Sequence, residues 1–150
     1  MPAKIMKLPD PRTEGTVSVE QALLTRRSVR RYKNEPLTIP EISQLVWSAQ
    51  GVSNPRGYRT TPSAGALYPL EVYVVAGNIN HLPAGIYKYL PGKHVLLKTI
   101  AGDRRSELSR AALHQSSIAN APAVLLLLGL GLLLVFLAIG MALPGNGTAQ

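Results

Sequence analysis

The sequence predicts one domain that mixes helices and strands, of the α/β or α+β class. Its 150 residues are a usual length for a single domain. The 46% hydrophobic content allows a substantial buried core and argues against a disordered chain. Segments with helical periodicity alternate with segments rich in β-branched residues, and this alternation predicts the mixed class.

Charge is spread unevenly along the chain. Sixteen Lys and Arg stand against eight Asp and Glu, giving a net charge of +8, and every charged residue lies within the first 110. A basic surface of this kind suits nucleic acid, anionic lipid or a phosphorylated cofactor. The chain has no cysteine, which excludes a disulfide scaffold and thiolate metal sites. Its three histidines are widely separated, so we expect no metal site.

Residues 1–17 are interpreted as an N-terminal arm, because they mix basic residues with prolines and carry no signal-peptide pattern. A first helix is predicted to begin after Ser18, which forms the S-x-x-Q pattern of a capping box with Gln21. This helix is expected to end near residues 26–28.

The second helix is predicted over residues 39–50, because Thr38 and Glu41 have capping-box spacing. Gly51 is expected to end it in the left-handed conformation. The i, i+3, i+4, i+7 spacing predicts one buried stripe, formed by Ile42, Leu45, Val46 and Ala49.

Residues 70–76 predict a strand, since they are rich in β-branched and aromatic side chains. Residues 86–90 and 94–100 predict a hairpin across Pro91-Gly92. A third helix is predicted to be capped by Asp103 and to continue until Pro122.

The segment 123–143 contains 21 residues without a charge or a strongly polar side chain. One interpretation is a transmembrane helix, with the preceding basic flank placing residues 1–122 in the cytoplasm. The other is a buried strand over 123–128, followed by a turn at 129–131. Periodicity does not separate the two.

Two further stretches have the composition of ligand-binding segments. Residues 26–31 hold four arginines and Ser28, whose guanidinium and hydroxyl groups are good donors to a phosphate. A solvated basic turn or a nucleic-acid surface is the alternative, although only Tyr32 is available nearby for base stacking. Residues 60–69 are rich in small and hydroxyl side chains, and Gly65 lets a planar ligand approach the backbone.

Taken in order, the motifs RRSVRRY, TIPEISQLVWSAQG and TTPSAGALYPLEVYVV resemble those of the nitroreductase-like flavoprotein superfamily. The resemblance is closest to its SagB-type branch, which includes azoline dehydrogenases, and it runs from about residue 18 to 124. It implies an α+β fold with a central, mostly antiparallel sheet flanked by helices. It also implies noncovalently bound FMN and a domain-exchanged homodimer with a flavin at each subunit interface.

The resemblance assigns flavin contacts residue by residue. It places a basic residue at the pyrimidine edge of the flavin ring, which is Arg30 here, and Tyr68 on the substrate side. The phosphate and ribityl contacts correspond to Arg26, Arg27 and Ser28. The loop along the flavin corresponds to Pro62, Ser63, Ala64, Gly65 and Ala66.

The implied function is that of a cytoplasmic FMN-dependent oxidoreductase. Hydride passes through flavin N5 between NAD(P)H, or a heterocyclic substrate, and an acceptor, so no catalytic side chain is required. The alternative is a noncatalytic basic protein anchored to a membrane by residues 123–143. Nucleic-acid binding is not expected, because the arginines already have a cofactor role and no nucleic-acid motif is present.

The sequence departs from the family pattern near its end. Residues 18–128 are interpreted as a partial nitroreductase-like domain, and 129–150 as an apolar segment atypical of the family. Residues 128–131 resemble the family's L-G-L-G turn, and 143–146 resemble a stretch before its final strand. Most of what should lie between and beyond them is absent. We therefore expect the second set of flavin contacts to be affected.

Overall fold

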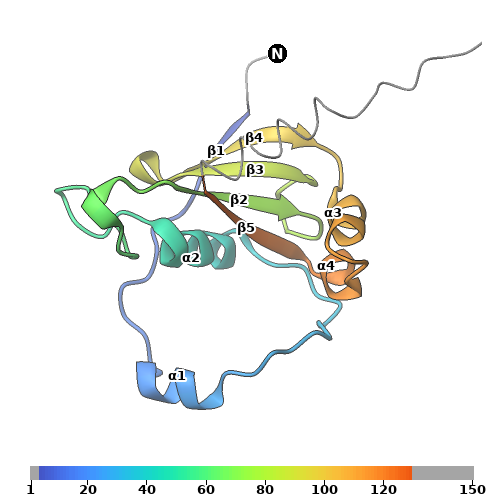
Figure 1. The fold of residues 1–150 in the computed structure, drawn as a ribbon, viewed down its shortest axis with the longest axis horizontal. Helices are drawn as coiled ribbons and strands as arrows, with labels where there is room; N and C mark the ends of the chain where they lie inside the picture. The colour runs from blue at the N-terminus through green and yellow to red at the C-terminus, as the bar shows by residue number, and fades with distance from the viewer. Residues whose placement is uncertain (1–3, 130–150) are drawn as a thin grey trace, which may run out of the picture.

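The computed structural model describes residues 4–129 as a five-stranded antiparallel sheet with helices beside it (Figure 1). The strand order is β1-β4-β3-β2-β5. The strands are β1 (Ile5–Lys7), β2 (Leu70–Ala76), β3 (Gly85–Leu90), β4 (Val95–Ala101) and β5 (Ala123–Gly129). The helices are α1 (Val19–Thr25), α2 (Ile39–Gln50), α3 (Arg105–Ala111) and α4 (Ser116–Asn120), with short 3₁₀ turns η1 (Ala64–Ala66) and η2 (Pro91–Lys93). The α+β prediction is confirmed.

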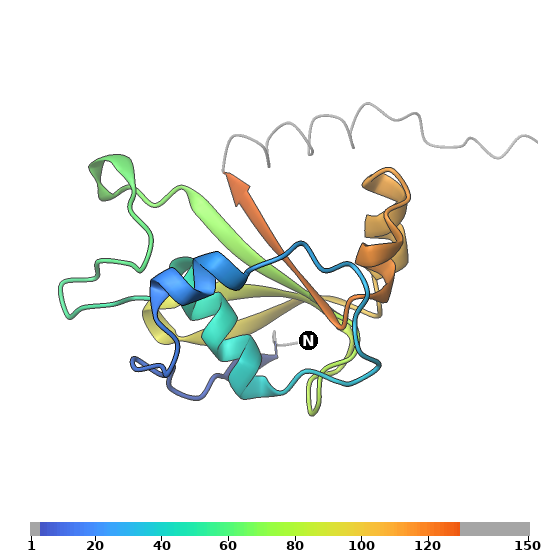
Figure 2. The ribbon, with the colours of Figure 1, turned by 90° about the horizontal axis from the view of Figure 1, so that it is seen from below.

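The core lies between the sheet and α2, which crosses one face (Figures 1 and 2). Ile42 and Val46 are fully buried, as predicted. Leu45 is 45% exposed, however, and Ser43 is buried on this helix instead. The buried side of α2 therefore includes Ser43 in place of Leu45. The Ser43 hydroxyl can be buried because it hydrogen-bonds to Pro9 and His94. Short helices α3 and α4 stand at one end of the sheet (Figure 2).

The first two predicted helix starts are present. The Thr38 hydroxyl accepts from the Glu41 amide and the Glu41 carboxylate accepts from the Thr38 amide, which is the complete capping box. Ser18 accepts from the Gln21 amide at 3.1 Å. Among the hydrogen bonds of residues 4–129 the return bond from the Gln21 side chain is missing, so the first helix has half of the predicted box.

The predicted ends of two helices are wrong. Gly51 is extended (φ −66°, ψ 155°) and not left-handed. A glycine is needed there because a Cβ would lie 2.1 Å from Cδ1 of Trp47. The single third helix is two helices, because Leu113 and His114 take positive φ values and reverse the chain. Asp103 also lies one position before the helix cap and accepts from the Arg105 amide at 3.0 Å.

Strand β5 resolves the ambiguity at the start of the apolar segment. Residues 123–129 pair with β2 along its whole length, from Ala76 opposite Ala123 to Leu70 opposite Gly129. The strand interpretation of residues 123–128 is therefore confirmed, and the membrane helix predicted to begin at residue 123 is wrong for this part. In the range 4–129, the structure contains no helix of the length and apolarity needed to cross a membrane. The rest of the segment, with the predicted turn at 129–131 and the 143–146 motif, extends outside the described residues.

The hairpin prediction is confirmed, since β3 and β4 pair across η2. Part of the predicted N-terminal arm also joins the sheet, because β1 pairs with β4 and Leu8 is buried.

A buried polar cluster fastens this N-terminal segment to the fold. His94 Nδ1 lies 2.8 Å from the hydroxyl of Tyr89, and His94 Nε2 lies 2.7 Å from Oγ of Ser43. The Ser43 hydroxyl in turn donates to the carbonyl of Pro9 at 2.6 Å. Burial raises the pKa of Tyr89 to about 12, so its hydroxyl stays protonated at neutral pH and can donate to the imidazole.

Candidate functional site

The connection from α2 to β2 turns back on the end of α2; we call residues 59–70 the bend. Thr60 Oγ1 donates to the carbonyl of Trp47 and Thr61 Oγ1 to that of Ala49, both at 2.9 Å. Gln50 Nε2 donates to Thr61 Oγ1 at 2.7 Å. The Thr61 hydroxyl thereby satisfies the Ala49 carbonyl, which the last turn of the helix leaves unpaired, and the Thr60 hydroxyl is a second donor to the Trp47 carbonyl beside the Gly51 amide. Together these bonds fix the bend against α2.

The backbone of the bend is strained. Gly65 takes a φ of 61° without steric cost, but Ala66 and Tyr68 have φ values of 52° and 46°, a region that residues with a side chain rarely adopt. Such strain costs of order 1–3 kcal/mol per residue and concentrates at functional sites. Tyr68 is held by two bonds: its amide donates to Ser63 Oγ at 2.9 Å, and the Arg59 amide donates to its phenol oxygen at 3.3 Å.

Two adjacent cavities follow the bend. The first, of about 220 Å³, is lined by Gln50, Pro62, Ser63, Ala64, Tyr68, Pro69 and Leu70. The second, also of about 220 Å³, is lined by Gln50, Arg59, Tyr68, Leu70, Glu71, Val72, Lys88, Tyr89, Leu90 and Pro91. They share Gln50, Tyr68 and Leu70. Four of the residues predicted from the resemblance therefore line the first cavity, with Gly65 and Ala66 in the same turn.

The second cavity contains a fixed set of charges. Lys88 Nζ is paired with Glu71 Oε1, and the Tyr73 hydroxyl donates to Glu71 Oε2 at 2.8 Å. The hydrogen bond from Lys88 lowers the pKa of Glu71, and the same bond raises the pKa of Lys88. The guanidinium of Arg59 lies over the Tyr68 ring, 4.4 Å from its centroid, and its Nη1 donates to Gln50 Oε1 at 3.1 Å.

The Glu71–Lys88 pair predicts a pH-dependent stability. Because the folded-state pKa of Glu71 is below 4.5, its contribution is present above that pH and is lost as the pH falls through the folded-state value. We expect Glu71→Gln to lower the free energy of unfolding at about pH 7, and the gap to wild type to narrow at about pH 3.5. Urea unfolding of both proteins at the two pH values measures this difference in the free energy of unfolding. Glu14→Gln is the control, an exposed carboxylate outside any element, and an equal Glu71→Gln gap at both pH values would contradict the assignment.

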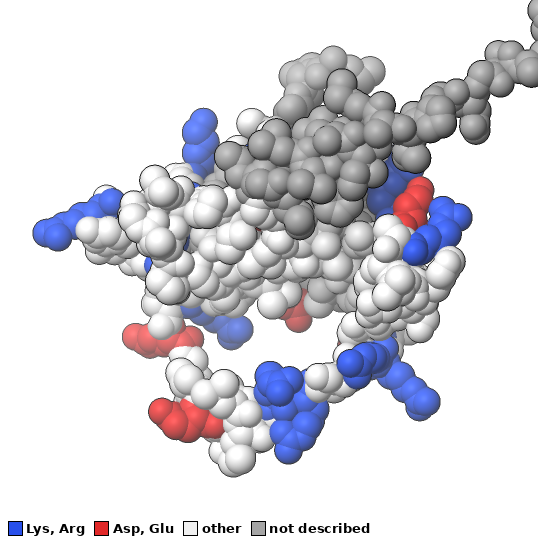
Figure 3. All heavy atoms as spheres, in the orientation of Figure 1, with Lys and Arg blue, Asp and Glu red and all other residues white. Residues whose placement is uncertain are grey.

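The predicted arginine segment lies elsewhere in the chain. Helix α1 has no buried residue and stands apart from the sheet in Figure 1, whereas η1 of the bend lies at the far left of the same view. Basic side chains gather over the segment that follows α1 (Figure 3). Among the hydrogen bonds and ion pairs of residues 4–129, none joins residues 26–31 to the bend. Within one chain the structure therefore does not bring together the two predicted halves of the flavin site.

The four residues of this segment that the resemblance assigns to the flavin, Arg26, Arg27, Ser28 and Arg30, are all exposed. Arg27 Nη1 donates to the carbonyls of Leu24 and Arg26, at 2.9 and 2.8 Å, and so caps the end of α1. The side chains of Arg26, Ser28 and Arg30 have no hydrogen-bond partner in the described part of the chain. They therefore keep their donors for an anion.

Helix α1 also exposes several large apolar side chains. Val19, Leu23 and Leu24 are each 70% exposed. A seven-residue helix is too short to be stable without tertiary packing. These three side chains form an apolar surface that the sheet of the described residues does not cover.

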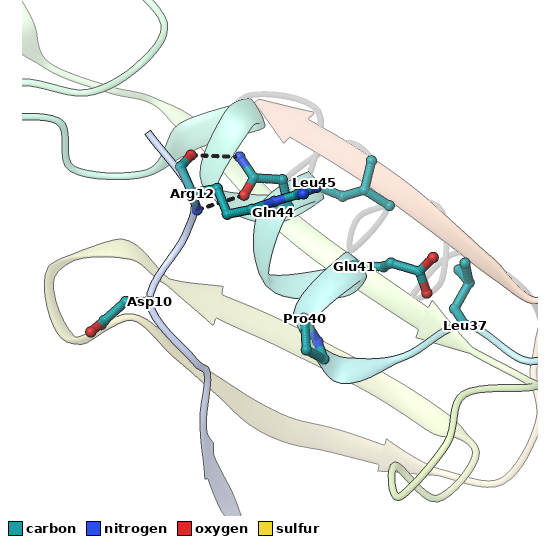
Figure 4. Close-up of a pocket in the computed structure, with 7 residues that line it drawn as sticks. All are labelled: Asp10, Arg12, Leu37, Pro40, Glu41, Gln44 and Leu45. Atoms are coloured by element: carbon teal, nitrogen blue, oxygen red, sulfur yellow. Dashed lines mark hydrogen bonds between the residues drawn. The ribbon is translucent and has the colours of Figure 1, made fainter. Parts of the chain in front are cut away.

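A larger cavity, of about 400 Å³, lies between residues 10–12 and α2 (Figure 4). The Arg12 amide donates to Gln44 Oε1 at 2.8 Å, and Gln44 Nε2 donates to the Arg12 carbonyl at 3.2 Å. The Gln44 side-chain amide thus both accepts from and donates to the backbone of Arg12, as the backbone of a neighbouring strand would. Leu37, Pro40 and Leu45 supply its apolar walls. This cavity has none of the predicted site residues.

The sequence profile of the nitroreductase family matches residues 23–142. This chain belongs to the nitroreductase family. The match includes α2, the bend and the sheet strands β2 to β5, so the family assignment rests on the elements that build the candidate site.

Relatives of the nitroreductase family agree with this assignment. A protein of Methanocaldococcus jannaschii, provisionally named a nitroreductase, is 43% identical over 111 residues, which are 74% of this chain and 56% of that protein. A crystal structure from Ralstonia eutropha JMP134, also provisionally named a nitroreductase, has a TM-score of 0.70 at 31% identity and covers 83% of this chain and 55% of that one. One from Anabaena variabilis has a TM-score of 0.69 at 22% identity, covering 85% and 27%, and shows the shared fold. The chain thus spans little more than half the length of the first two relatives.

Two site residues were not predicted from the sequence. Arg59 and Gln50 are brought together by the reversal of the chain between Val52 and Arg59, which form an isolated β-bridge. The loop between them has the turn motif Asn54-Pro55-Arg56-Gly57, and the Gly57 amide donates to the Asn54 carbonyl at 3.0 Å. The motif predicts the turn, but not which side chains on either side of it meet.

Proposed function

We propose that this nitroreductase-family chain is an FMN-dependent oxidoreductase, of the SagB type that its motifs resemble. Bound FMN would supply hydride transfer through N5 between NAD(P)H, or a heterocyclic substrate, and an acceptor. The observation that carries the proposal is the strained bend, whose predicted residues Pro62, Ser63, Ala64 and Tyr68 line one cavity. The family match supports the same assignment.

The donor set fits a flavin mononucleotide. The side chains of Arg26 and Ser28 are exposed and have no partner in the described range, which leaves them free for a phosphate. Arg30 would supply positive charge at the pyrimidine edge of the ring, where negative charge develops on reduction. Small side chains in the bend leave room for a flat ring beside Tyr68, which we place on the substrate side.

We propose further that the two halves of the site come from two copies of the chain. Residues 26–31 and the bend do not meet within one chain, and the apolar side of α1 is exposed. Packing α1 of one copy onto the other buries that apolar side and carries its arginines toward the partner's bend. This arrangement is a homodimer with a flavin at each interface.

The test is a titration of the purified full chain with FMN, followed by absorbance and flavin fluorescence. The mass of the titrated protein is then measured by light scattering. We expect equimolar FMN that stays bound through gel filtration and is released on denaturation, and the mass of a dimer. A colourless protein that takes up no added FMN would contradict the flavin assignment. A monomer that binds FMN would contradict the shared site only.

A further inference from the structure

Arg59 is the starting point, because it is a half-buried cation without an acidic partner among the described residues. The ion pairs of residues 4–129 are Lys88–Glu71, Arg104–Glu107 and Arg105–Asp103, and none includes Arg59. A guanidinium that is partly removed from water loses solvation, and an anion is the usual compensation. Arg59 also lines a cavity, so such an anion has space to reach it.

The guanidinium is held in place before any ligand arrives. It stacks 4.4 Å from the centre of the Tyr68 ring, and Tyr68 is itself locked by its bonds to Ser63 and the Arg59 amide. Nη1 donates to Oε1 of Gln50, a side chain only 3% exposed and anchored to Thr61. An arginine has five N–H donors, and this is the one side-chain bond of Arg59 in the described structure. The remaining donors can therefore face the cavity as a fork.

The other charges of the cavity are already used. Glu71 accepts from Lys88 and Tyr73, and Lys88 is paired with Glu71. The repulsion that the Glu71 carboxylate would exert on an incoming anion is thus balanced by the adjacent ammonium. Tyr89, on the same wall, keeps its proton at neutral pH because burial raises its pKa to about 12. The net charge presented to a ligand is that of Arg59.

We propose that this cavity is the subsite for a carboxylate carried by a small planar substrate, with the carboxylate bound by the fork of Arg59. Tyr68 and Leu70 belong to both cavities, so the ring of that substrate extends past Tyr68 toward the cavity of the bend. The cavity of about 220 Å³ suits a single aromatic ring or its carboxylate end. The proposal rests on the proposed function for the place of the flavin, and on the Arg59 geometry for the chemistry of the substrate.

The experiment compares 4-nitrobenzoate with 4-nitrobenzamide, which has a similar shape and no charge. Binding of each to the full chain is measured by isothermal titration calorimetry, with and without saturating FMN. Arg59→Gln removes the fork, Arg59→Lys keeps the charge, and Arg56→Gln is the matched control, an exposed arginine of the same loop outside the cavity. The melting transition of each variant checks that it folds, and Arg59→Lys carries the test if Arg59→Gln does not.

Wild type and Arg56→Gln are expected to bind the carboxylate about tenfold or more tightly than the amide, because a hydrogen bond to a charged group contributes that much. Arg59→Gln should lose this preference, and Arg59→Lys should retain only part of it. The affinity for the amide should stay unchanged in all variants, which a general loss of structure would not allow.

Two results overturn the subsite: no carboxylate preference in wild type, or the same preference in Arg59→Gln. If the chain binds FMN but shows no preference, the subsite fails and the proposed function stands. If it shows the Arg59-dependent preference but binds no FMN, the subsite stands and the proposed function fails.

Discussion

Replacing both Arg26 and Ser28 with alanine is expected to weaken FMN binding by at least about a hundredfold. Each side chain would donate to the phosphate, and a hydrogen bond to a charged group contributes about 1.5–3 kcal/mol, or roughly tenfold to a hundredfold in affinity. These two residues are chosen over Arg27 because Arg27 already donates to the carbonyls of Leu24 and Arg26. Its loss would also disturb the end of α1.

The affinity is measured by quenching of flavin fluorescence, for each single variant and for the double variant. Arg110→Ala is the matched control: it also removes an exposed positive charge, but from α3, and should leave the affinity unchanged. If the Arg26 variant and this control lose the same amount of FMN affinity, the effect comes from net charge and not from a contact with the phosphate. An unchanged affinity in the double variant would place the phosphate away from α1.

Ile42→Ala is expected to lower the free energy of unfolding by about 2–5 kcal/mol. Ile42 is 0% exposed and packs in the core between α2 and the sheet, so the truncation leaves a cavity that this rigid contact cannot close. Because α2 also carries Gln50, which anchors Arg59, the variant should loosen the bend as well.

Urea unfolding followed by circular dichroism measures the change. Leu45→Ala removes a leucine from the same helix, but one that is 45% exposed, and should lower the free energy of unfolding by only about 1 kcal/mol. If both variants lose the same free energy of unfolding, α2 does not face the sheet with the side that contains Ile42.

The helix and strand starts could be predicted because their signals are local. The capping box of Thr38 and Glu41 and the β-branched run of β2 each act within a few residues. The break between α3 and α4 could not be predicted, since Leu113 and His114 adopt positive φ values without a glycine or proline to announce them. Tertiary context overrides the local preference there.

The candidate site was predictable in part for a similar reason. The bend is continuous in sequence, so four of its predicted residues line one cavity, while their contact with a flavin stays a prediction. Arg59 and Gln50 could not be predicted, because their contact depends on how far the chain doubles back after α2. The convergence of residues 26–31 on the bend remains a prediction, because no hydrogen bond or ion pair among the described residues of one chain joins them.

The pairing of β1 with β4 determines when one edge of this sheet is covered. The hydrogen-bonding distance between Pro9 and His94 joins residues 85 positions apart, and Pro9 is synthesised well before its partner. Until residues 94–101 are synthesised, the N-terminal strand has no partner, and afterwards β4 keeps an open edge until that strand returns. Deleting residues 4–9 would therefore leave an unprotected strand edge, which is a template for association between chains during synthesis.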